Sequence, residues 1–106
     1  MMPLLQPVIT ELKERLKGLY GESLERVVLF GSQARGNAAE GSDIDVLVVL
    51  KGPVSPGKEI SRTGEITASL SLRHDVVISC TFVSADRYET GKSPLILNVH
   101  REGVVV

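Results

Sequence analysis

A Gly-Ser pair, ten further residues and an Asp-x-Asp pair at the head of an apolar segment constrain this chain more than any other stretch. Gly31 and Ser32 follow one short apolar segment, and Asp43 and Asp45 open the next. Because one residue separates the two carboxylates, they project from the same face of a β-strand. The two like charges repel each other, and a cation that prefers hard oxygen ligands, such as Mg²⁺, relieves that repulsion. The stretch therefore predicts a metal site at the start of a strand.

Length and composition indicate one small globular domain covering residues 1–106. Hydrophobic residues make up 42% of the chain and charged residues 24%, which is close to the average for folded domains. The formal net charge of −1 argues against a broad basic surface, so direct nucleic-acid binding is not expected.

The single cysteine indicates a reducing compartment, because one thiol cannot form an intrachain disulfide. Cys80 lies late in an apolar segment, where a buried packing thiol is a better interpretation than a nucleophile. We see no basic leader followed by an apolar region, and the longest apolar run is far shorter than the ~20 residues that span a bilayer. We therefore expect a soluble, cytoplasmic protein.

Apolar periodicity predicts an amphipathic helix over residues 6–19 and strands over residues 25–30 and 43–50. In the second strand both faces are apolar beyond Asp45, so this strand should be central in its sheet. Asp43 and Asp45 then lie at the edge of a buried region, where carboxylates are costly unless they are paired or bound to metal.

Residues 58–72 fit a helix and a strand equally well, and topology decides between the two. If Gly31 and Ser32, after the first strand, are to meet Asp43 at the start of the second, those two strands run antiparallel. If residues 74–80 form a strand that brings Asp75 to the two aspartates, that strand must run parallel to residues 43–50. Parallel neighbours need a long, usually helical, crossover, so we predict a helix over residues 58–72. His74 is interpreted as a strand-end residue rather than a metal ligand, since Mg²⁺ sites prefer oxygen.

Asp75 is the candidate third carboxylate. At the head of the predicted strand over residues 74–80, it shares a face with Val77 and Ser79. Three carboxylates at adjacent strand starts make the type of two-metal site used in nucleotidyl transfer.

The C-terminal part predicts two helical pieces and a short strand. Ser84 is a candidate N-cap, residues 94–98 are apolar and helical, and residues 103–106 form a strand or tail. The valines of this tail can pair with a sheet edge of this chain or of a partner.

The motif Gly31-Ser32, ten residues, then Asp43-x-Asp45 resembles the signature of the DNA polymerase β-like nucleotidyltransferase superfamily. GSQARG, GSDIDVLVV and the closing PLILNVHREGVVV are similar to its minimal nucleotidyltransferases (MNT proteins), and the resemblance covers nearly the whole chain. It implies an α/β (α+β) fold: a small mixed β-sheet with helices packed mainly on one side, as in the polymerase β-like palm.

The resemblance also implies roles for residues. Asp43, Asp45 and Asp75 would be the catalytic and metal-binding carboxylates, holding two Mg²⁺ ions, and Asp75 would also be able to take up the acceptor's proton. ATP would be the substrate. The nucleotide-binding residues would lie around the two Gly-Ser pairs, and they are Gly31, Ser32, Arg35 and Ser42.

MNT proteins of this kind are paired with HEPN-domain toxins, so the resemblance implies a HEPN partner and an antitoxin that adds AMP to a tyrosine of that toxin. The alternative is a non-catalytic antitoxin that neutralises a HEPN partner by complex formation. With either function the chain can form a homo- or hetero-oligomer. A third reading, an antibiotic- or RNA-modifying transferase, lacks any recognition domain or basic face in this chain.

Overall fold

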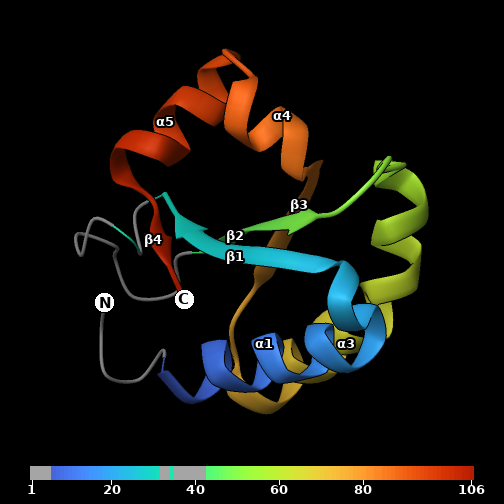
Figure 1. Ribbon diagram of the computed structural model, residues 1–106. Helices are drawn as coiled ribbons and strands as arrows, with labels where there is room; N and C mark the ends of the chain where they lie inside the picture. The colour runs from blue at the N-terminus through green and yellow to red at the C-terminus, as the bar shows by residue number, and fades with distance from the viewer. Residues whose placement is uncertain (1–5, 32–33, 35–42) are drawn as a thin grey trace.

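The described part of the chain folds as a four-stranded mixed sheet with helices on both faces (Figure 1). The structure is a computed structural model, and it describes residues 6–31, 34 and 43–106. The elements in chain order are α1 (Gln6–Tyr20), the 3₁₀-helix η2 (Gly21–Ser23), β1 (Leu24–Phe30), β2 (Ile44–Leu50), α3 (Pro56–His74), β3 (Ile78–Ser84), α4 (Ala85–Thr90), α5 (Pro94–Glu102) and β4 (Val104–Val105).

The sheet has the strand order β3-β2-β1-β4, so β2 lies between β1 and β3. β1 pairs antiparallel with β2, and β3 pairs parallel with β2, as the sequence predicts. Helix α3 makes the crossover between these parallel strands, which confirms its predicted helical state. β4 pairs antiparallel with β1, so the tail completes the sheet of its own chain.

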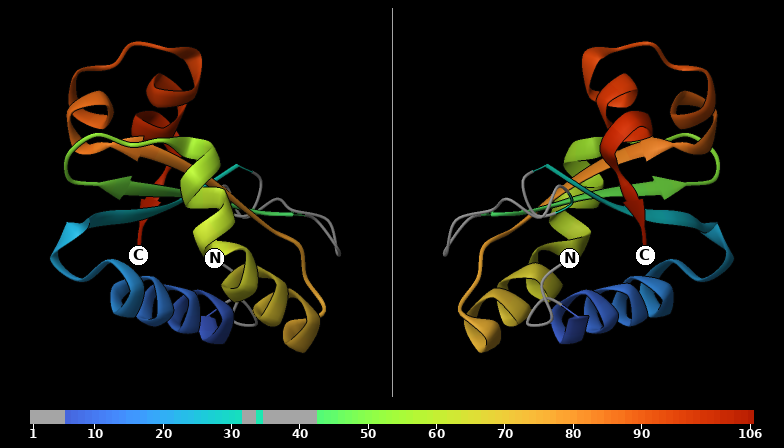
Figure 2. Two further views of the ribbon diagram at one scale, coloured as in Figure 1. Left: turned by 90° about the vertical axis from the view of Figure 1, so that its right-hand side faces the viewer. Right: turned by 90° about the vertical axis from the view of Figure 1, so that its left-hand side faces the viewer.

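Two hydrophobic cores lie on opposite faces of the sheet (Figure 2). On one face the long helices α1 and α3 pack against a row of β2 that includes Val46 and Val48. On the other face the short helices α4 and α5 pack against Leu47 and Val49. The mixed α/β fold class is confirmed, with the longer helices gathered on one side.

Helices α1 and α3 are amphipathic, and each buries one stripe of side chains. Leu12 and Leu16 of α1 and Leu70 of α3 are completely buried. Among the helices of the described ranges, none is both long and apolar enough to cross a membrane.

Serine side chains fix the starts of α4 and α5. The Ser84 hydroxyl accepts a hydrogen bond from the Arg87 N–H at 3.1 Å, which confirms Ser84 as an N-cap. Ser93 caps α5 in the same way, accepting from the Ile96 N–H at 3.3 Å. These caps set where the second helical layer begins.

The predicted strand over residues 74–80 is wrong in its start. Helix α3 continues to His74, and β3 begins only at Ile78. Asp75 is the C-cap of α3 in the left-handed conformation (φ 53, ψ 50), and its N–H donates to the Ser71 carbonyl. Asp and Asn tolerate this conformation better than most residues, so an aspartate can end a helix where glycine is more usual.

Candidate functional site

Asp43 and Asp45 meet at the start of β2, as the sequence predicts. Asp43 is exposed and directly precedes the strand, whereas Asp45 is its second residue and half-buried. In the sheet, Asp45 lies opposite Phe30 of β1 on one side and opposite Ser79 of β3 on the other. The Asp45 carboxylate thus lies between the end of β1 and the start of β3.

Gly31 directly follows β1 and lies against the Asp45 carboxylate. Its φ is +74°, which L side chains rarely adopt. A Cβ at Gly31 would stand 2.5 Å from Asp45 Oδ2, too close for a real contact. Only glycine therefore lets the backbone of the turn after β1 approach the carboxylate this closely.

The environment of Asp45 disfavours its charged form. Burial, and then the negative charge of Asp43, raise the pKa of the Asp45 carboxyl above its usual value. Within the described ranges, no residue donates a hydrogen bond or forms an ion pair with Asp45. Two neighbouring carboxylates offer hard oxygen donors that fit a divalent cation such as Mg²⁺, which Asp43 and Asp45 would hold together.

Asp75 lies at the end of α3 and not on β3 as predicted. Its side chain is exposed at the C-cap of α3, before β3 begins. In the part of the chain that the structure describes, no three His, Cys, Asp or Glu residues gather closely enough to hold a metal ion. The role of Asp75 as third carboxylate and base stays a prediction.

Sequence reasoning missed Ser79 as the β3 neighbour of Asp45. The parallel register pairs Ile44 with Ile78 and Asp45 with Ser79. The predicted strand placed Asp75 at the head of this row because it began four residues too early. The only local signal was the capacity of aspartate for a left-handed helix cap.

Three predicted nucleotide-binding residues, Ser32, Arg35 and Ser42, lie outside the described residues.

Cys80 is half-buried, and burial raises the pKa of its thiol to about 11. That pKa agrees with a packing thiol, because a nucleophilic cysteine needs a thiolate near neutral pH. His74 has its Nε2 buried without a hydrogen-bond partner in the described part of the chain.

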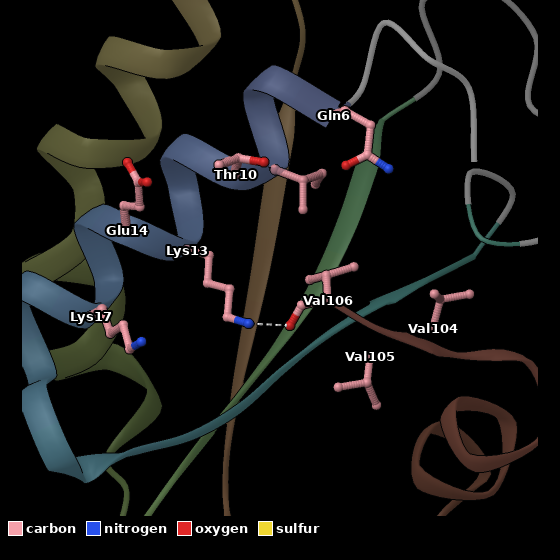
Figure 3. Close-up of a pocket in the computed structure, with 9 residues that line it drawn as sticks. Gln6, Thr10, Lys13, Glu14, Lys17, Val104, Val105 and Val106 are labelled. Carbon is pink, nitrogen blue, oxygen red and sulfur yellow. Dashed lines mark hydrogen bonds between the residues drawn. The ribbon is translucent and has the colours of Figure 1, made fainter.

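A groove of about 490 Å³ lies on another part of the surface, between α1 and β4 (Figure 3). Lys13 spans it, donating a hydrogen bond from Nζ to the Val106 carbonyl at 2.7 Å. The predicted site residues do not line this groove. Asp43, by contrast, is exposed directly before β2.

A match to a known family identifies the domain. Residues 9–96 match the family described as the nucleotidyltransferase domain, and this range contains Gly31, Asp43, Asp45 and the strands that carry them. The chain belongs to the nucleotidyltransferase family. It is therefore an enzyme of the transferase class.

One named relative of this nucleotidyltransferase agrees with the family match. It is 35% identical over 99 residues to MJ0141 of Methanocaldococcus jannaschii, which is named as a candidate protein adenylyltransferase; the alignment covers 93% of this chain and 95% of that protein.

Solved structures share its fold. A chain of the crystal structure of a toxin-antitoxin with AMP-PNP superimposes with a TM-score of 0.62 at 21% identity, covering 89% of this chain and 68% of that one. A chain of a rebuilt structure of the tri-AMPylated Shewanella oneidensis HEPN toxin in complex with MNT antitoxin gives 0.54 at 18% identity, covering 92% of this chain and 70% of that one. At these identities the likeness concerns the fold.

Proposed function

We propose that this nucleotidyltransferase transfers AMP from ATP to a hydroxyl of a partner protein, specifically to a tyrosine of a HEPN-domain toxin, and thereby acts as an antitoxin. The observation that carries the proposal is the contact between Gly31 and Asp45, which joins the turn after β1 to the carboxylate pair. Its support also includes the similarity to a protein named for adenylyl transfer and to toxin-antitoxin structures. A cytoplasmic location is part of the proposal.

In the proposed reaction, Asp43 and Asp45 hold Mg²⁺, and the turn beginning at Gly31 holds the triphosphate with Ser32, Arg35 and Ser42. When bound, Mg²⁺ stabilises the attacking and leaving oxygens of the transfer. The acceptor oxygen forms a bond to the α-phosphorus. The bond between this phosphorus and the oxygen that bridges it to the β-phosphorus breaks. Pyrophosphate leaves, and the hydroxyl proton passes to water.

The open position of the carboxylates favours a protein acceptor over a small one. Asp43 is exposed directly before β2, so an acceptor can approach it from solvent. A site of this kind needs the acceptor's own surface to exclude water from the reacting atoms. A folded partner provides such a surface.

A second function, neutralisation by binding alone, is favoured by the exposed edge of the sheet at β4. Val104 is 40% exposed and Val105 is 57% exposed on this edge strand. Exposed apolar side chains on an unpaired strand edge are suited to contact with another protein.

The test incubates the protein with ATP labelled at the α-phosphate, Mg²⁺ and a HEPN-domain protein encoded in the same genome. Label should appear on the partner and disappear when Asp43→Ala and Asp45→Ala are combined. Label that survives this double substitution would place the reaction elsewhere. If the double variant still binds and neutralises the partner as well as the wild type does, the binding function accounts for the antitoxin.

A further inference from the structure

The face of the sheet that carries Asp45 is only partly covered. Helices α4 and α5 pack over a cluster that includes Leu47, Val49 and Val83. The same face continues beyond this cluster to the starts of β2 and β3, where Asp43, Val77 and Ser79 are all exposed. An uncovered row of side chains therefore begins where the second helical layer ends.

Ser79 of β3 and Val77, which directly precedes β3, lie beside the carboxylates in this row. The parallel register pairs Asp45 with Ser79, and Ile44 with Ile78, so Val77 lies next to Asp43. The Ile44 N–H donates to the Val77 carbonyl at 2.8 Å, which fixes this alignment. Neighbouring strands are about 5 Å apart, and paired residues project from the same face, so the Ser79 hydroxyl and the Asp45 carboxylate stand side by side.

The two neighbours of β2 divide the site into two sides. Gly31, at the end of β1, lies against the Asp45 carboxylate from one side. Ser79, on β3, lies on the other side. In an in-line transfer the attacking and leaving oxygens are on opposite sides of the phosphorus. If pyrophosphate leaves at the Gly31 turn, the acceptor hydroxyl must arrive over β3.

We infer that Ser79 and Val77 form the acceptor subsite, in which the Ser79 hydroxyl hydrogen-bonds the incoming hydroxyl and Val77 contacts an apolar or aromatic side chain that carries it. This inference rests on the proposed function and specifies its acceptor side. Val77 is 55% exposed, so its apolar surface is free to be covered by such a side chain.

The outer edge of β3 gives the acceptor access. β3 is an edge strand, paired only with β2 among the described strands. Ser79 is exposed on this edge, on the face of β3 opposite the one that α3 covers. The acceptor's polypeptide can thus reach Ser79 without displacing a helix.

The experiment measures AMP transfer from ATP to the HEPN-domain protein, with each substrate varied in turn while the other is saturating. Ser79→Ala should raise the KM for the partner about fivefold, the effect of one lost hydrogen bond, and leave the KM for ATP unchanged. Ser79→Thr should restore the wild-type KM because it restores the hydroxyl. Val77→Ser should also raise the KM for the partner.

Thr81→Val is the matched control, because it removes a hydroxyl two residues further along the same face of β3, opposite Leu47. It should leave both KM values unchanged. Calorimetric binding of the partner to the AMP-PNP-loaded protein gives a readout without turnover, and Ser79→Ala should weaken that binding by a similar factor.

The inference would be overturned if Ser79→Ala left the KM for the partner unchanged, or changed the KM for ATP instead. In that case transfer by the wild type would still support the proposed function. A loss of transfer in Asp75→Asn with no effect of Ser79→Ala would assign the acceptor side to Asp75. Absence of transfer by the wild type would refute the proposed function and this inference together.

Discussion

The backbone of Gly31 and the carboxylate of Asp45 are so close that a single methyl group between them would stand 2.5 Å from Asp45 Oδ2. The contact joins the end of β1 to the second residue of β2. It makes glycine a requirement of the site as well as of the turn, because the position also has a φ of +74°.

Gly31→Ala should therefore abolish AMP transfer, since the Asp45 carboxylate must move to admit the methyl group. The left-handed backbone adds a stability cost of roughly 1–2 kcal/mol. Gly52→Ala is the matched control, because Gly52 has a φ of +79° but no atom lies within 4 Å of the point that its methyl group would occupy. Urea denaturation should show similar losses of stability in both variants, with transfer retained only in Gly52→Ala. Equal transfer by the two variants would contradict the role of the contact.

Asp45→Asn should make the metal-free protein more stable near neutral pH. Burial and the charge of Asp43 raise the pKa of Asp45, so protonation stabilises the folded state, and this contribution is lost as pH rises through the raised pKa. Melting temperatures measured in EDTA should thus favour Asp45→Asn at pH 7, and the difference should vanish at acidic pH. Mg²⁺ should raise the melting temperature of the wild type but not of the variant. A wild type that is more stable than Asp45→Asn in EDTA at pH 7 would refute this account of the charges.

Partly buried Tyr20 and buried Glu59 form a polar pair that should stabilise the packing of α1 against α3. The Tyr20 hydroxyl donates to Glu59 Oε1 at 2.7 Å, and Arg62 Nη1 lies 3.3 Å from the same oxygen. Burial, and then this hydrogen bond, raise the pKa of the Tyr20 hydroxyl. Tyr20→Phe should lower the free energy of unfolding by about 1–3 kcal/mol, because it leaves a buried carboxylate with fewer donors.

Chemical denaturation of Tyr20→Phe, Glu59→Gln and the double variant measures this coupling. The double variant should lose less stability than the two single losses added together. Strictly additive losses would show that the two side chains act independently.

Cys80 should react slowly with thiol reagents at pH 8 in the folded protein and rapidly in urea. Burial raises the pKa of its thiol from 9.0 to about 11, so little thiolate is present at that pH. The raised pKa also means that the contribution of Cys80 to stability is complete below pH 9 and is lost as pH approaches 11. Reaction in the folded state at the rate seen in urea would refute this burial.

The sequence was most informative where periodicity and topology agreed. The spacing of apolar residues predicts α1, and the need to bring Gly31 to Asp43 predicts antiparallel β1 and β2, both of which the structure confirms. The crossover argument also chose helix for residues 58–72, within α3. These predictions succeeded because each rests on a pattern that extends over many residues.

The start of β3 was not predictable in the same way. The helix ends at a single left-handed residue, Asp75, and no glycine marks the position. A one-residue helix cap leaves little trace in an apolar pattern, so the predicted strand began too early. The side chain beside Asp45 is consequently Ser79, which only the sheet register reveals.

The most direct test of adenylyl transfer at Asp43 and Asp45 compares ATP labelled at the α-phosphate with ATP labelled at the γ-phosphate, each incubated with Mg²⁺ and the HEPN-domain protein. The account predicts label on the partner only from the α-phosphate, one pyrophosphate released for each AMP transferred, and no label with the Asp43→Ala and Asp45→Ala double variant. Label on the partner from the γ-phosphate, or α-label that persists in the double variant, would contradict it.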